Sequence, residues 1–163
     1  MLFLLLPHIN MVGGMKMRRK IDALSEVHGS EEYPDIFGNV TFKQLRSGVY
    51  VKAEIFGLPD TNGIYGFHIH EGSMCEGNDE DPFADAMGHY NPGNTEHPYH
   101  SGDMPPLFNC HGYAYMTFLT DRFNVSEIID RTVIIHAGVD DFTSQPSGNS
   151  GIKMACGEII KYH

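Results

Sequence analysis

The stretch Gly66-Phe67-His68-Ile69-His70-Glu71 places two histidines two residues apart in an otherwise apolar segment. Residues two apart on a β-strand point to the same side, so His68 and His70 would share one face of a strand. Two imidazoles held side by side in this way form half of a metal site. The alternative is a pair of surface histidines on a half-exposed strand, since this pattern alone is weak.

Further candidate metal ligands follow this strand. Ten histidines are a high count for 163 residues, and several gather downstream of His70. These candidates are His89, His97, His100, Asp103 and His136. Zinc takes about four nitrogen, sulfur or oxygen ligands, and oxidised copper prefers nitrogen ligands. Together with His68 and His70 they make seven side chains, which hold two four-coordinate ions only if one imidazole is shared through both nitrogens.

The chain around these residues has the pattern of an all-β fold. Its clearest strand runs from Val49 to Phe56, where every second side chain is apolar. We expect about seven further strands, near residues 21–28, 36–43, 65–70, 107–119 (two around a turn), 131–136 and 153–161. Residues 121–130 form a polar connector with one helical turn. Abundant glycine and proline suit such short strands, so the pattern predicts an antiparallel sandwich or barrel.

Two long segments, residues 71–104 and 137–152, lack periodicity. A loop of more than thirty residues is uncommon in a compact domain unless it is functional or disordered. A bound metal could supply the order that a core does not.

Length and charge restrict the class of protein. A chain of this length predicts one domain, which we place at residues 18–163. The formal net charge of −10 makes nucleic acid and anionic membranes poor partners, and no apolar run reaches the length of a membrane span. The apolar start, Met1 to Leu6, is too short for a signal peptide and precedes the basic cluster, so we expect residues 1–17 to be a disordered leader. The lack of a clear signal peptide favours a cytoplasmic location, and a degenerate export signal is the alternative.

Several motifs between Gly66 and Cys156 resemble the copper/zinc superoxide dismutase family. The segments that carry the resemblance are Gly66 to Glu71, Gly88-His89-Tyr90-Asn91-Pro92, His100-Ser101-Gly102-Asp103, Arg131 to His136, Asp140-Asp141, Gly148-Asn149-Ser150-Gly151 and Ala155-Cys156-Gly157. With weaker similarity in the early strands, the resemblance covers about 140 residues. It implies an eight-stranded antiparallel Greek-key β-barrel with two long functional loops.

The resemblance also implies roles for single residues. Copper would be held by His68, His70, His89 and His136, and zinc by His89, His97, His100 and Asp103. Asp140 would link a copper ligand to a zinc ligand, because an imidazole ligand usually needs its other nitrogen anchored; the alternative for Asp140 and Asp141 is a solvated acidic turn. Cys75 and Cys156 would form a disulfide and Cys110 would be a free thiol. The remaining histidines, His8, His28, His111 and His163, are expected on the surface.

Two features depart from the family pattern. His97 and His100 are only three residues apart, which makes His97 the least secure zinc ligand. Lys153 stands where the family usually carries an arginine that guides the anionic substrate, and lysine keeps the charge but loses the planar fork of donors. We expect activity to survive at a reduced rate.

The implied function is the conversion of superoxide to dioxygen and hydrogen peroxide, with His68, His70, His89, His136 and Lys153 at the catalytic site. A homodimer is a candidate assembly, since dimers are common in this family. One alternative is a copper- and zinc-binding module without turnover. Another is a zinc hydrolase, which would need an open zinc position and a nearby general base such as Glu71.

Overall fold

A computed structural model describes residues 20–60 and 63–163; the leader predicted at 1–17 lies outside these residues. The described residues form nine strands, one short α-helix and one 3-10 helix: β1 (Ala23–Gly29), β2 (Phe37–Leu45), β3 (Gly48–Phe56), β4 (Ile64–Tyr65), β5 (Phe67–His70), η1 (Ala84–Ala86), β6 (Leu107–Phe108), β7 (Tyr113–Thr120), α1 (Val125–Ile128), β8 (Thr132–His136) and β9 (Lys153–Lys161). In the part of the chain that the structure describes, no helix is both long and apolar enough to cross a membrane.

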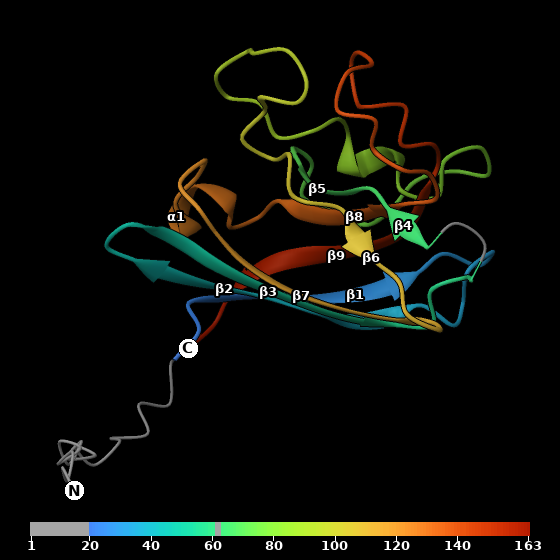
Figure 1. Cartoon of the computed structure of the whole chain (residues 1–163), viewed down its shortest axis with the longest axis horizontal. Helices are drawn as coiled ribbons and strands as arrows, with labels where there is room; N and C mark the ends of the chain where they lie inside the picture. The colour runs from blue at the N-terminus through green and yellow to red at the C-terminus, as the bar shows by residue number, and fades with distance from the viewer. Residues whose placement is uncertain (1–19, 61–62) are drawn as a thin grey trace, which may run out of the picture.

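Seven strands form one curled antiparallel sheet in the order β5-β8-β9-β1-β2-β3-β7, and β4 pairs with β6 beside it (Figure 1). The first strand therefore lies next to the last, and β3 pairs with β7 across the intervening loops. This arrangement confirms the predicted antiparallel Greek-key class. The single strand predicted near residues 65–70 is divided, because Tyr65 pairs with Leu107 whereas Phe67 pairs with Ile135. The helical turn predicted between β7 and β8 is α1.

The core lies inside the curl of the sheet and follows the predicted alternation. On β3, Val49, Val51, Ala53 and Ile55 are fully buried, while the residues between them are partly exposed. Alternation of this kind marks a sheet with one face in the core and one in water.

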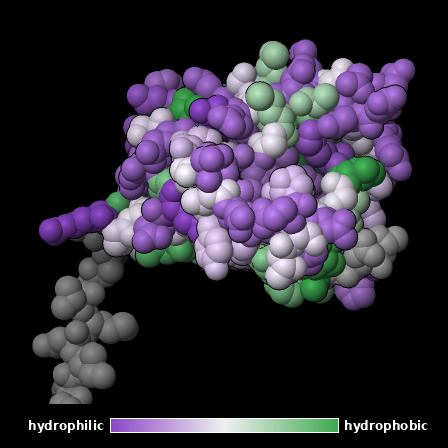
Figure 2. Space-filling view, turned by 90° about the horizontal axis from the view of Figure 1, so that it is seen from above, coloured by the Kyte–Doolittle hydropathy of each residue, from purple (hydrophilic) through white to green (hydrophobic). Residues whose placement is uncertain are grey.

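Strands β5 and β8 are different, because both of their faces are buried. Phe67 and Ile69 belong to the core, whereas His68 and His70 point to the other face and are only 0% and 2% exposed. The alternative of two surface histidines is therefore wrong. The two long loops, which lie together on one side of the sheet, cover this second face (Figure 1). Seen from the loop side, the molecular surface is mostly hydrophilic (Figure 2).

A disulfide ties the first long loop to β9. Cys75 and Cys156 are joined across a sequence separation of 81 residues, as predicted. Beside the bond, Phe83 and Ala86 of the loop pack on Ile134 in a small apolar cluster that includes Cys156. Cys110 is free and exposed, in agreement with the prediction.

Candidate metal centre

The first long loop runs along the open edge of β5, and its backbone places two candidate ligands there. The Ile69 amide donates to the Gly102 carbonyl at 2.9 Å, and the Tyr90 amide donates to the Ile69 carbonyl at the same distance. The approach is so close that a Cβ on Gly102 would lie 2.2 Å from that Ile69 oxygen, which explains the glycine. This pairing sets His89 beside His70 and Asp103 beside His68.

Two side chains hold the part of the loop that carries His97 and His100. Arg122, from the connector after β7, donates through Nη1 to the carbonyls of Pro98 at 2.8 Å and His100 at 3.1 Å. Gln145, from the second long loop, accepts from the His97 amide at 3.0 Å and donates to the His97 carbonyl at 2.8 Å. These contacts fix the backbone on both sides of the short spacing between the two histidines.

The structure brings all seven predicted ligands together in two groups. The four-histidine group is His68, His70, His89 and His136, and the His/Asp group is His89, His97, His100 and Asp103. Within each group the candidate ligand atoms lie within 4.8 Å of one another, and every member is buried. His89 belongs to both groups. His97 lies in the His/Asp group, although its short spacing to His100 made it the least secure of the predicted ligands.

In the four-histidine group, an acceptor outside the group occupies one nitrogen of three rings. His68 Nε2 bonds to Asp140 at 2.8 Å, while Nδ1 of His70 and Nδ1 of His136 donate to the carbonyls of Met87 at 2.8 Å and Gly151 at 3.2 Å. The remaining nitrogens face inward. His70 Nε2 and His136 Nε2 are 3.2 Å apart, and both carry lone pairs when the rings are neutral.

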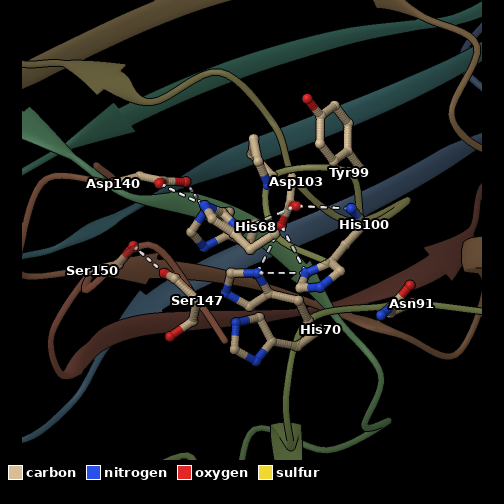
Figure 3. A network of polar contacts seen from close by, with 12 residues as sticks. His68, His70, Asn91, Tyr99, His100, Asp103, Asp140, Ser147 and Ser150 are labelled. Atoms are coloured by element: carbon tan, nitrogen blue, oxygen red, sulfur yellow. Dashed lines mark hydrogen bonds and ion pairs between the residues drawn. The ribbon is translucent and has the colours of Figure 1, made fainter. Parts of the chain in front are cut away.

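The His/Asp group centres on Asp103. One of its carboxylate oxygens is 2.7 Å from His89 Nδ1 and 3.3 Å from His100 Nδ1, and the other is 3.2 Å from His97 Nδ1. Figure 3 shows Asp103 against His100, with His68 and His70 on the neighbouring side. Three imidazole nitrogens and one carboxylate converge here, a donor set that suits tetrahedral zinc.

Asp140 links the two groups. Its carboxylate, 2% exposed, contacts His68 Nε2 at 2.8 Å and His97 Nε2 at 2.9 Å (Figure 3). Gly148 makes room for it, since a Cβ there would lie 2.0 Å from Asp140 Oδ1. The solvated-turn alternative is wrong for Asp140. It holds for Asp141, which is exposed and accepts hydrogen bonds from Thr143 and Ser144.

Burial favours the neutral form of His68, His70 and His136. It lowers the pKa of His68 to about 4 and that of His136 to about 3, and it lowers the pKa of His70 well below 6.5. Burial acts against ionisation of Asp140, but hydrogen bonds from His68, from the Phe142 amide and from His97 outweigh it and lower the pKa to about 2. Neutral imidazoles and an ionised carboxylate are the forms that bind metals and anchor their ligands.

The residues fit two metal ions. His68 Nδ1 and His89 Nε2 are buried without a hydrogen-bond partner, and His97 Nδ1 makes no hydrogen bond although an Asp103 oxygen lies 3.2 Å away. Burial of such polar atoms is costly. The facing lone pairs of His70 and His136 would repel one another unless a cation lay between them. A cation in each group removes both penalties. Four nitrogen donors suit copper in the first group, and the mixed set suits zinc in the second.

A cavity of about 600 Å³ opens onto the four-histidine group, and His70, His89 and His136 form part of its wall. Lys153 lines the same cavity, opposite His136 in the pairing of β8 with β9. Its ammonium group bonds to Asp81 at 2.6 Å and to the Phe83 carbonyl at 2.9 Å. The cavity wall also carries Glu71, Glu80 and Asp81.

Three residues that shape this centre have no signal in the sequence: Asp81, Arg122 and Gln145. Each acts through a contact with a residue far away in the chain, which no local pattern reports. A glutamine in a long polar loop is ordinary by composition.

Comparisons with known proteins agree with this geometry. The copper/zinc superoxide dismutase family model matches residues 36–159. The superoxide dismutase [Cu-Zn] of Legionella pneumophila is 34% identical over 146 residues, which cover 85% of this chain and 86% of the relative. Superoxide dismutase [Cu-Zn] 2 of Aquifex aeolicus is 31% identical, covering 77% and 80%. The structure of Cu/Zn superoxide dismutase from Brucella abortus superposes with a TM-score of 0.72 at 28% identity, covering 84% of this chain and 99% of the other.

The fold and the two donor groups define the class of all-β proteins with two adjacent candidate metal sites that have one histidine in common. Residues 36–159 carry the sequence pattern of one such family. The chain belongs to the copper/zinc superoxide dismutase family.

Proposed function

We propose that this protein disproportionates superoxide, with copper bound by the four-histidine group and zinc bound by the His/Asp group. The observation that carries the proposal is the position of His89, whose ring belongs to both groups. Its Nδ1 lies 2.7 Å from Asp103, while its Nε2 is buried without a partner. When bound, copper supplies the one-electron exchange that turns two superoxide anions and two protons into dioxygen and hydrogen peroxide, and zinc is redox-inert.

The protein residues prepare this chemistry in three ways. The anchored rings of His68, His70 and His136 present their free nitrogens in fixed directions, so little reorganisation is needed on metal binding. His89, which lines the cavity, is placed to hold a proton at Nε2 and pass it to the product. Asp140 contacts His68 of one group and His97 of the other, and so fixes the orientation of the two rings relative to each other.

Lys153 is the proposed guide for the substrate. It places a positive charge in the wall of the cavity that reaches the histidines. A positive charge in such a cleft attracts an anion to a protein whose net charge is −10. Electrostatic steering of the substrate is already known for this enzyme family, and Lys153 would serve the same purpose here.

The test is metal analysis with a copper EPR spectrum of protein prepared with both ions, together with a superoxide dismutation assay. We expect one copper and one zinc per chain, a spectrum of nitrogen-ligated copper, and turnover. Metal-loaded protein without turnover would instead indicate the non-catalytic metal-binding module. Hydrolytic turnover of the zinc-only form would favour the hydrolase alternative with Glu71.

The zinc assignment has its own test in Asp103→Ala. Because Asp103 contacts all three histidines of its group, we expect the variant to lose zinc and to become more open to proteolysis within residues 71–104. Metal analysis and limited proteolysis measure both effects. Unchanged zinc content and an unchanged cleavage pattern would contradict the assignment.

The disulfide also bears on location. Disulfides persist in oxidising compartments and are rare in the cytosol, so the Cys75–Cys156 bond favours the export alternative over the cytoplasm predicted from the sequence. We propose that the protein works outside the cytoplasm, which cell fractionation tests. A homodimer stays a prediction, to be tested by light scattering of the metal-loaded protein.

A further inference from the structure

We propose that Asp81 is the built-in counter-ion of Lys153 and that it weakens the attraction of the metal cavity for anions. Asp81 would then be a specificity-determining residue that limits how strongly small anions, superoxide included, are drawn toward the copper ligands. The inference rests on the proposed function of the four-histidine group as a copper site.

The ion pair is close and partly sheltered. Lys153 Nζ lies 2.6 Å from Asp81 Oδ2, and the two side chains are 13% and 38% exposed. The Phe83 carbonyl takes a second hydrogen bond from the ammonium at 2.9 Å. Two of the three protons of the ammonium are therefore directed at protein oxygens, and little of its charge is free to meet an anion in the cavity.

The Asp81 carboxylate is held in place independently of Lys153, by hydrogen bonds within its own loop. The Phe83 amide donates to Asp81 Oδ1 at 3.0 Å, and the Asp81 amide donates to Asn78 Oδ1 at 3.1 Å. Phe83, which follows Asp81 by two residues, packs against the sheet next to the Cys75–Cys156 bond. Asp81 is thus held in a tight turn on an anchored part of the loop. A preorganised charge of this kind costs little entropy to maintain.

The chemistry of lysine makes this pairing effective. An ammonium is a compact point charge, and one carboxylate at hydrogen-bond distance neutralises most of it, whereas a guanidinium has further donors to spare. Glu71 and Glu80 add negative charge to the same wall. An incoming anion must therefore compete with Asp81 for Lys153, against a background that repels it.

The experiment compares Asp81→Asn with Asp85→Asn in the copper- and zinc-loaded protein. Both variants remove one negative charge from the same loop, but Asp85 is exposed on η1 and does not line the cavity. Sodium azide is the probe, and its dissociation constant is read from the visible spectrum of the copper. We expect Asp81→Asn to tighten azide binding about threefold and to raise kcat/KM for superoxide by a similar factor at low salt. Asp85→Asn should change neither value.

Two further measurements separate a charge effect from a disturbed loop. Asp81→Glu should return azide binding toward the native value, and Asp81→Ser replaces Asp81→Asn if the latter does not load metal. Added salt should reduce the gain, because screening weakens the interaction. Equal effects of Asp81→Asn and Asp85→Asn, or weaker azide binding in Asp81→Asn, would overturn the inference. A native protein that binds azide but does not turn over superoxide would refute the proposed function and leave the azide comparison to decide on Asp81.

Discussion

At the scale of single residues, the centre depends on which nitrogen of each ring is anchored. A carboxylate holds His68, and the carbonyls of Met87 and Gly151 hold His70 and His136. Each anchor fixes a ring orientation and leaves the other nitrogen for a metal. The acceptors come from both long loops, Met87 from the first and Asp140 and Gly151 from the second, so the tautomers are a property of the folded state.

Asp140→Asn tests this anchoring, because Asp140 contacts His68 in one group and His97 in the other. Loss of such an outer contact typically weakens metal binding by about 10- to 100-fold, and we expect an effect of that size at both sites. Competition with a chelator, followed by metal analysis, measures the affinities. Asp141→Asn is the matched control, since it removes the same charge from an exposed neighbour. A loss confined to one metal would contradict the linking role.

At the scale of elements, the long loops are held by the strands and connectors around them. The first loop pairs with the edge of β5, and Arg122 after β7 binds its carbonyls at Pro98 and His100. The loop that carries the candidate zinc ligands is therefore attached from two sides. This explains how a segment without periodicity can still place its histidines accurately.

Arg122→Gln removes the second attachment. Because the lost hydrogen bonds come from a charged donor, we expect faster proteolysis within residues 95–104 and roughly tenfold weaker zinc binding. Limited proteolysis of metal-free protein and a zinc titration measure these effects. Arg46→Gln, at an exposed site in the turn between β2 and β3, should leave both unchanged. If the two variants behave alike, Arg122 does not position the loop.

At the scale of the whole molecule, the disulfide joins the first loop to the last strand. Opening an 81-residue connection removes about 4 kcal/mol of stability in the chain-entropy model. We expect Cys75→Ser to lower the free energy of unfolding by roughly that amount, measured by urea denaturation. Cys110→Ser is the control, because Cys110 is free and exposed. A difference below about 1 kcal/mol between the two variants would show that the bond does not stabilise the fold.

The stability of the metal-free protein should also depend on pH. The pKa values of His68 and His136 fall to about 4 and about 3 in the folded protein because of burial, from 6.5 in the unfolded chain. Below pH 6.5 the unfolded chain therefore binds protons that the folded protein does not. Stability is lost as pH falls from 6.5 toward 4, by roughly 1 kcal/mol per pH unit for each ring. Urea denaturation at about pH 7 and about pH 5 measures this, and equal stabilities would contradict the burial of neutral rings.

The sequence by itself determined the strands, the placement of His68 and His70 on one face, and the set of seven candidate ligands, which the structure brings together. Alternation with period two reports which face of a strand is buried, and the spacing of histidines reports donor chemistry. It missed the division of the strand at Gly66, because that break depends on which neighbour each half pairs with.

Only the tertiary structure decided which nitrogen each ring presents and what surrounds Lys153. Asp81 lies 72 residues from Lys153, and Arg122 reaches a loop about twenty residues before it. Such contacts form when the chain closes on itself, and local patterns carry no record of them. The physical reason is that periodicity describes the path of one strand, whereas the electrostatics of a cavity depend on every segment that forms its wall.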